Sequence, residues 1–89
     1  MIERTLKVEN KLGLHARASA KLAHLLSGFS ASAFLTFRGR EINAKSILGL
    51  MTLAAGQGSE LQIKLDGKDE EKAWTAVSEL FRRKFDEGE

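Results

Sequence analysis

The hydrophobic residues of this chain change their spacing along the sequence, and these changes restrict the fold more than any other feature. Four segments alternate apolar and polar residues, as strands with one buried face do: 2–8, 31–37, 41–43 and 60–66. Three segments repeat apolar residues every three or four positions, as amphipathic helices do: 16–27, 46–53 and 69–85. The order β-α-β-β-α-β-α predicts a two-layer α+β domain that spans residues 1–89.

Capping residues mark the ends of the predicted helices. Gly28 is a typical C-terminal stop for the first helix, Ser46 is a preferred N-cap for the second, and Asp69 can cap the third. The two long helices are each expected to pack one face on the sheet. The expected residues are Ala18, Leu22, Leu25 and Phe29 in the first helix, and Ala73, Trp74, Val77, Leu80, Phe81 and Lys84 in the last.

Composition and charge exclude several classes of protein. The absence of cysteine excludes a disulfide scaffold, and no apolar run approaches the ~20 residues that span a bilayer. The first residues do not resemble a signal peptide, so we expect a cytoplasmic location and no membrane insertion. Fourteen Lys and Arg residues against twelve Asp and Glu residues leave a net charge of +2, and these charges are interleaved along the chain. We therefore expect no nucleic-acid partner, because such proteins gather basic residues on one face.

Few side chains of this chain can carry covalent or metal chemistry, since it has no cysteine and no tyrosine. The two histidines are nine positions apart, and neither has a carboxylate at the spacing of a helical metal site. The glycines of segment 56–58 lead into a strand, whereas a phosphate-binding glycine loop leads into a helix. We expect no metal and no cofactor. A chain of this size seldom holds a complete substrate pocket, so a carrier or binding module is expected rather than a self-sufficient enzyme.

His15 is the strongest candidate for a functional residue because it lies where a loop becomes the first helix. Backbone N–H groups of a first helical turn have no partner within the helix, and the helix dipole adds partial positive charge. Such a site favours a phosphate-sized anion and disfavours a charged imidazole, which leaves a nucleophilic nitrogen available. Arg17 can donate hydrogen bonds to the same anion. Two interpretations follow from the position alone: a phosphate-carrying histidine, or a polar residue that only caps the helix.

Two segments resemble a known family. Residues 10–20 read NKLGLHARASA, which is similar to the histidine-site signature of the HPr phosphocarriers of the bacterial phosphotransferase system. Residues 44–51 read AKSILGLM, which is similar to the regulatory-serine segment of that family, at the expected separation. The resemblance covers essentially the whole chain. Residues 79–86, ELFRRKFD, also resemble the ends of the nitrogen-branch carriers (NPr), so the carbohydrate and nitrogen branches both stay open.

The resemblance implies an open-faced β-sandwich of four antiparallel strands covered on one side by three helices. It implies that His15 accepts a phosphoryl group on Nδ1 from phosphorylated Enzyme I, which phosphoenolpyruvate charges, and passes it to a histidine of an enzyme IIA. Arg17 and the backbone of Ala16 and Arg17 would bind the phosphoryl group, and the chain would act as a monomer. The family usually has proline where this chain has Ala18, a position in the first turn where proline removes no needed donor.

The second helix carries the other candidate residues. Ser46 is adequate as a helix cap, and the resemblance adds phosphorylation by HPr kinase/phosphorylase; both roles are compatible. Leu50 and Leu53 are spaced to face the core together, so Ile47, Leu48 and Met51 cannot all be buried as well. We expect these three residues to form a partner surface, to which an exposed His24 contributes; the simpler interpretations are core packing for the three and a solvated surface position for His24.

Three functions remain to be compared. The first is a phosphocarrier, and the second is a regulatory binding protein of the same fold that transfers no phosphoryl group. Retention of His15 argues against the second. A small nucleic-acid-binding domain is the third, and the scattered charges argue against it.

Overall fold

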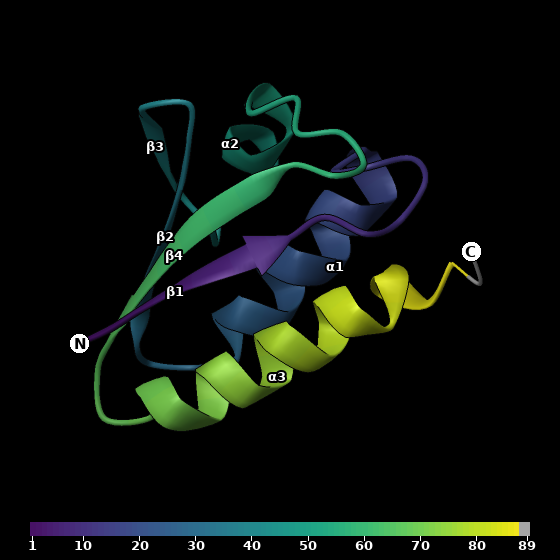
Figure 1. Cartoon of the computed structure of the whole chain (residues 1–89). Coiled ribbons are helices and arrows are strands. Elements are labelled where there is room, and N and C mark those ends of the chain that lie inside the picture. Colours follow the sequence, from purple (N-terminus) through teal and green to yellow (C-terminus); the bar gives the residue numbers. More distant parts are fainter. Residues whose placement is uncertain (88–89) are drawn as a thin grey trace.

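The computed structural model describes residues 1–87 and consists of one antiparallel sheet with helices on one of its faces (Figure 1). The strands are β1 Ile2–Lys7, β2 Ser32–Phe37, β3 Arg40–Asn43 and β4 Glu60–Asp66. The helices are α1 Ala16–Ser27, α2 Ile47–Thr52 and α3 Glu70–Arg82, followed by the short 3-10 helix η1 Lys84–Asp86. The predicted element order and the open-faced α+β sandwich are confirmed.

The sheet has the strand order β1-β4-β2-β3, in which all neighbours are antiparallel. The central strand β4 buries Leu61, Ile63 and Leu65, which alternate along it and point toward the helices. Register aligns Ile63 with Leu35 of β2, so that apolar residues of adjacent strands share one face. The predicted hairpin of β2 and β3 is present, with its turn at Arg38 and Gly39.

The buried stripe of α1 differs in part from the prediction. Ala18 and Leu22 are fully buried as expected, but Leu26 is the next buried leucine, whereas Leu25 and Phe29 are only partly buried. The helix packs along the row of residues spaced four apart, so a residue at the spacing of Leu25 falls at the edge of the contact. The C-terminal stop at Gly28 is confirmed.

Asp69 does not cap α3 with its side chain, in contrast to the prediction. Its carboxylate instead accepts hydrogen bonds from the backbone N–H groups of Ser30 and Ala31, both at 2.9 Å. These hydrogen bonds outweigh desolvation and hold the pKa of Asp69 below its ordinary value. The side chain ties the start of α3 to the segment between α1 and β2, a contact that local spacing does not reveal.

The last helix is shorter than predicted. It ends at Arg82, and Lys84, Phe85 and Asp86 follow with positive φ angles of 55°, 56° and 62°. Phe85 is fully buried against Phe81, so the chain turns sharply to place this ring in the core. The prediction that the helix continues to residue 85 and that Lys84 extends its stripe is therefore wrong.

Trp74 also departs from the core assignment. Its ring is only partly buried, and the Arg4 guanidinium lies over it at 5.9 Å. The other expected residues of α3 are buried: Ala73, Val77, Leu80 and Phe81. Across residues 1–87, no helix combines the length and the apolar character that crossing a bilayer requires.

Candidate functional site

The loop before α1 has one defined conformation, which determines where His15 lies. Gly13 has a φ of +68°, and a Cβ atom on it would lie 2.5 Å from the Ala55 carbonyl oxygen, so this position requires glycine. The Leu14 N–H donates to that same oxygen at 2.9 Å. The buried Asn10 side chain donates to the Gly13 carbonyl at 2.8 Å. These contacts fix the path of the chain into the first residue of the helix.

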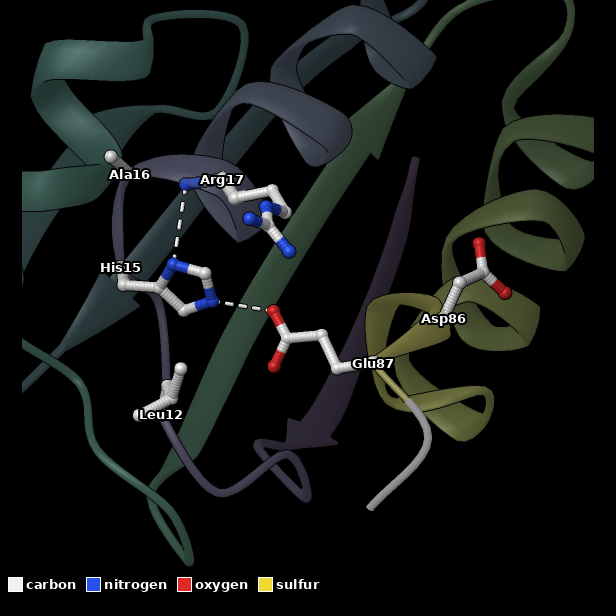
Figure 2. A pocket seen from close by; sticks show the side chains of 6 residues that line it. All are labelled: Leu12, His15, Ala16, Arg17, Asp86 and Glu87. Carbon is white, nitrogen blue, oxygen red and sulfur yellow. Dashed lines mark hydrogen bonds and ion pairs between the residues drawn. The ribbon is translucent and has the colours of Figure 1, made fainter.

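His15 is the N-cap residue of α1, as its position in the sequence predicts. Its backbone is extended, and its carbonyl accepts the helical hydrogen bond of the Ser19 N–H at 2.9 Å. Its ring atom Nδ1 accepts a hydrogen bond from the Arg17 N–H at 3.3 Å (Figure 2). This distance is beyond the usual range for such bonds, so the cap is a weak one. The side chain is 27% exposed, so the ring is accessible as well as capping.

The other edge of the ring contacts a residue that the sequence analysis missed. Glu87, which follows η1, accepts a hydrogen bond from His15 Nε2 through Oε2. Its second oxygen, Oε1, accepts from the Asn10 side chain at 3.0 Å. Figure 2 shows the ring between the Arg17 amide on one side and the Glu87 carboxylate on the other. The site thus joins the loop before α1 to the segment after α3.

Glu87 is ionised at neutral pH in spite of its burial. Its side chain is only 7% exposed, and burial by itself raises the pKa of a carboxyl group. Hydrogen bonds from Asn10 and His15, together with the positive charges nearby, outweigh that effect and hold the pKa of Glu87 below its ordinary value. An ionised carboxylate only accepts hydrogen bonds. The hydrogen-bond network therefore assigns the ring proton to Nε2 of His15 and the lone pair to Nδ1.

A cleft of about 510 Å³ opens at this site, between the start of α1 and the residues after α3. Its lining residues are Leu12, His15, Ala16, Arg17, Asp86 and Glu87. The volume lies within the range of small-molecule pockets, ~300–1,000 Å³, which we did not expect in so short a chain. Figure 2 shows the Arg17 side chain on the same side of the helix start as the His15 ring. A guanidinium beside the backbone amides of a first helical turn suits a small anion.

The second helix presents a different kind of surface. The Ser46 side chain caps α2 by accepting a hydrogen bond from the Gly49 N–H at 3.0 Å, as predicted. Leu50 and Leu53 are buried, whereas three apolar residues of the same helix are exposed, as their spacing indicates. These three, which we call the α2 patch, are Ile47, Leu48 and Met51. The helices α1 and α2 pack against each other, and the start of α1 and α2 lie at the same end of the molecule (Figure 1).

The structure brings some of the predicted residues together and separates others. His15, Ala16 and Arg17 share the cleft, while Ser46 and the α2 patch form a neighbouring surface. His24 is exposed, nine residues along α1 from His15. Leu12 also was not predicted; it is 65% exposed and lines the cleft. In the described part of the chain, no cluster of three or more His, Cys, Asp or Glu side chains is arranged to hold a metal ion.

This sheet and its helices, with a histidine and an arginine at an open helix start, define a histidine-containing α+β sandwich domain. Comparison with known proteins narrows the class. The family model described as "PTS HPr component phosphorylation site" matches residues 2–83. The chain belongs to this family, the HPr phosphocarriers of the phosphotransferase system.

Individual relatives extend over the whole chain. The Phosphocarrier protein HPr of Xylella fastidiosa (strain Temecula1 / ATCC 700964) is 53% identical over 87 residues, which cover 98% of each chain. The Phosphocarrier protein NPr of Escherichia coli (strain K12) is 38% identical over 87 residues, covering 97% of each. Among solved structures, HPr-C-His from Thermoanaerobacter tengcongensis has a TM-score of 0.93 at 39% identity and covers 98% of both chains.

Proposed function

We propose that this chain receives a phosphoryl group on Nδ1 of His15 from phosphorylated Enzyme I and passes it to a histidine of an enzyme IIA. The group derives from phosphoenolpyruvate. The observation that carries this proposal is the position of Nδ1, which faces the Arg17 N–H at the start of α1 at 3.3 Å. A nitrogen lone pair and an anion-binding helix start therefore meet at one point.

The residues of the cleft suit the transfer step. The Nδ1 lone pair of His15 attacks phosphorus, and the bond from phosphorus to the donor atom of Enzyme I breaks, so that the donor atom takes the electron pair. The phosphoryl oxygens then replace Nδ1 as the acceptor for the Arg17 amide, and they can also accept from the Ala16 amide, because neither amide has a carbonyl partner within the first turn. The Arg17 guanidinium adds charged donors as the negative charge shifts onto the bound group.

Labelling of the chain tests this role directly. Incubation with Enzyme I and phosphoenolpyruvate labelled with ³²P is expected to give one acid-labile, base-stable phosphoryl group per chain. The variant His15→Ala should lose the label while its circular dichroism spectrum is unchanged. The matched control is His24→Ala, which removes the other histidine, an exposed residue of α1; it should reach the same final stoichiometry of label as the wild type, whatever its effect on the rate of labelling by Enzyme I. Labelling of His15→Ala would contradict the proposal and favour another acceptor; no labelling of the wild type would favour a regulatory binding protein.

The α2 patch is the surface that we assign to Enzyme I and enzyme IIA. Leu48 is 75% exposed, and Ile47 and Met51 are exposed beside it. Apolar side chains gathered on one exposed helix face are typical of interaction sites, and methionine adapts to several partners. We also propose that His24, which is exposed in the last turn of α1, contributes to partner contacts.

A charged substitution in the patch tests the assignment. Leu48→Asp should weaken Enzyme I binding by at least ~1 kcal/mol, because it places a charge in an apolar contact. The thermal unfolding temperature should change little, since the side chain is exposed. The matched control is Phe34→Asp, which introduces the same charge at an exposed apolar residue of β2, opposite Lys64 of β4. Equal binding losses in both variants would contradict a specific contact at α2.

Ser46 is assigned a regulatory role through phosphorylation by an HPr kinase/phosphorylase. A phosphate there adds a charge of about −1.5 to −2 at the start of α2, next to Ile47 and Leu48. The charge suits the amides of the helix start but repels a partner that delivers an anionic phosphoryl group. We also propose that the chain acts as a cytoplasmic monomer, for which light scattering should give a mass near 9.8 kDa.

A further inference from the structure

The segment after α3 has an unusual backbone conformation that neither the sheet nor the three helices require. Lys84, Phe85 and Asp86 all have left-handed backbone angles, which residues other than glycine rarely adopt in succession. The turn is anchored by the fully buried Phe85 ring and by Lys21, whose Nζ donates to the Phe85 carbonyl at 2.7 Å. Strain of this kind persists only where surrounding contacts determine it, and it is frequent at functional sites.

The consequence of this turn is the position of Glu87. The side chain is directed back toward α1, where Oε2 meets Nε2 of His15 and Oε1 accepts from Asn10 at 3.0 Å. Asn10 is itself fully buried and fixed to the Gly13 carbonyl, so it serves as a rigid support for the carboxylate. The loop before α1 and the segment after α3 thus meet at the ring that we assign as the phosphoryl acceptor.

We propose that Glu87 is a positioning residue for phosphoryl transfer, which holds the proton of His15 on Nε2 and stabilises positive charge on the ring as Nδ1 binds phosphorus. This inference rests on the proposed function. The carboxylate contacts the edge of the ring opposite Nδ1, so it does not occupy the place of the phosphoryl group (Figure 2). A carboxylate that orients a histidine in this way fixes its tautomer and its ring orientation.

The charge balance of the step shows why the carboxylate is useful. A neutral His15 ring with its proton on Nε2 donates the Nδ1 lone pair to phosphorus, while the donor atom takes the electron pair of the broken bond. The His15 ring then carries a positive charge, because Nε2 keeps its proton. The Glu87 carboxylate stabilises this charge in a partly buried site, where electrostatic interactions are stronger than in water. When the group leaves for the next acceptor, the electron pair returns to Nδ1 and the ring is neutral again.

The substitution Glu87→Gln tests the proposal with two independent measurements. Asn10 and His15 contact different oxygens of the carboxylate, and the amide replaces one of these oxygens by an NH2 donor, so in the same orientation it cannot accept from both. We expect ¹⁵N NMR of the ring to show His15 mainly as the Nε2–H tautomer in the wild type and a smaller share of it in the variant. We also expect phosphorylation of His15, with Enzyme I and with phosphoramidate as a small donor, to slow by ~10-fold, as for other partners that orient a functional histidine.

The controls separate positioning from folding and from the proposed function. Glu79→Gln makes the same substitution on α3 at a residue paired with Arg82, and should leave both measurements unchanged. Glu87→Ala serves if Glu87→Gln unfolds, and should have at least as large an effect on the tautomer and the rate. An unchanged tautomer, or a shifted tautomer with an unchanged rate, would overturn the role of Glu87 alone. A wild type that accepts no phosphoryl group would overturn the proposed function, while the tautomer measurement would still report on the contact.

Discussion

The starts of α1 and α2 follow the same local rule and serve different purposes. Ser46 caps α2 through a short bond, 3.0 Å, to the N–H three residues later. His15 caps α1 through a longer one, 3.3 Å, to the N–H two residues later. Each side chain thus accepts from one backbone N–H of its first helical turn, and the serine hydroxyl makes the shorter bond of the two. The shorter capping bond therefore lies at the helix start that does not carry the proposed phosphoryl acceptor.

The two capping residues also differ in their surroundings. His15 is reached by Glu87 from a segment 72 residues away, and a cleft opens beside it. The hydrogen bonds of Ser46 join it to residues within four positions in the sequence, and the exposed side chains of α2 beside it include three apolar ones. The comparison teaches that a helix start becomes a candidate reactive site through tertiary contacts, and that the capping rule alone does not distinguish the two.

The largest change in stability is expected for a substitution that removes the tertiary contacts of the α1 start. Phe85→Ala should lower the free energy of unfolding by about 3–5 kcal/mol, because a fully buried ring is lost from the core. The anchor of the turn that positions Glu87 is lost with it, so the Glu87 contact to His15 should weaken. Chemical denaturation measures the stability, and ¹⁵N NMR of the His15 ring measures the contact. A stable protein with an unchanged His15 ring signal would show that Phe85 is not the anchor.

The sequence predicts the features that depend on local spacing, and it does not predict those that depend on tertiary contacts. The strands, α1, the Ser46 cap and the exposure of the α2 patch depend on spacing within one segment, and each was predicted. Asp69 was assigned to its own helix because the contact with Ser30 and Ala31 joins segments that are distant in sequence. The apolar spacing of α3 also predicts no break before Phe85, because that residue continues the spacing. In the structure Phe85 is buried through a left-handed turn after the helix and not as part of it.

The candidate site shows the same limit. His15 and Arg17 were predicted because a motif and a helix start coincide there. Asn10 lay inside that motif, but its role depends on a buried contact to Glu87 that no local pattern contains. An acidic residue near the end of a charged segment gives no signal of its own, since most such residues are solvated. Only the left-handed turn, which sequence spacing does not encode, brings Glu87 to the ring.

A smaller effect is expected at the α2 start. Ser46→Ala should lower the free energy of unfolding by ~1 kcal/mol, because the Gly49 N–H loses its acceptor. Ser46→Asp keeps an acceptor at the cap and should retain the wild-type unfolding temperature. It should nevertheless slow phosphorylation of His15 by Enzyme I, and high salt should reduce this slowing by screening the added charge. Equal transfer rates for Ser46→Asp and the wild type would leave Ser46 with a structural role only.

The smallest changes in stability are expected when proline is placed at the third residue of α1 and of α2, which are equivalent positions in the two helices. Ala18 is the third residue of α1 and lies before Ser19, whose N–H donates the helical bond to His15, so proline there removes no helical hydrogen bond. Ala18→Pro should raise the free energy of unfolding by ~0.4–1 kcal/mol, because proline restricts the unfolded chain.

Gly49 is the third residue of α2, and its N–H donates to Ser46 Oγ at 3.0 Å. Gly49→Pro should therefore destabilise the protein by ~1 kcal/mol, as expected for loss of a cap. Thermal unfolding of the two variants gives the signs directly. Stabilisation by both prolines would mean that the Ser46 cap contributes little, and destabilisation by both would mean that the buried Ala18 site has no room for the ring. Opposite signs at equivalent positions would confirm that the N–H of the third helical residue bonds to the cap in α2 but not in α1.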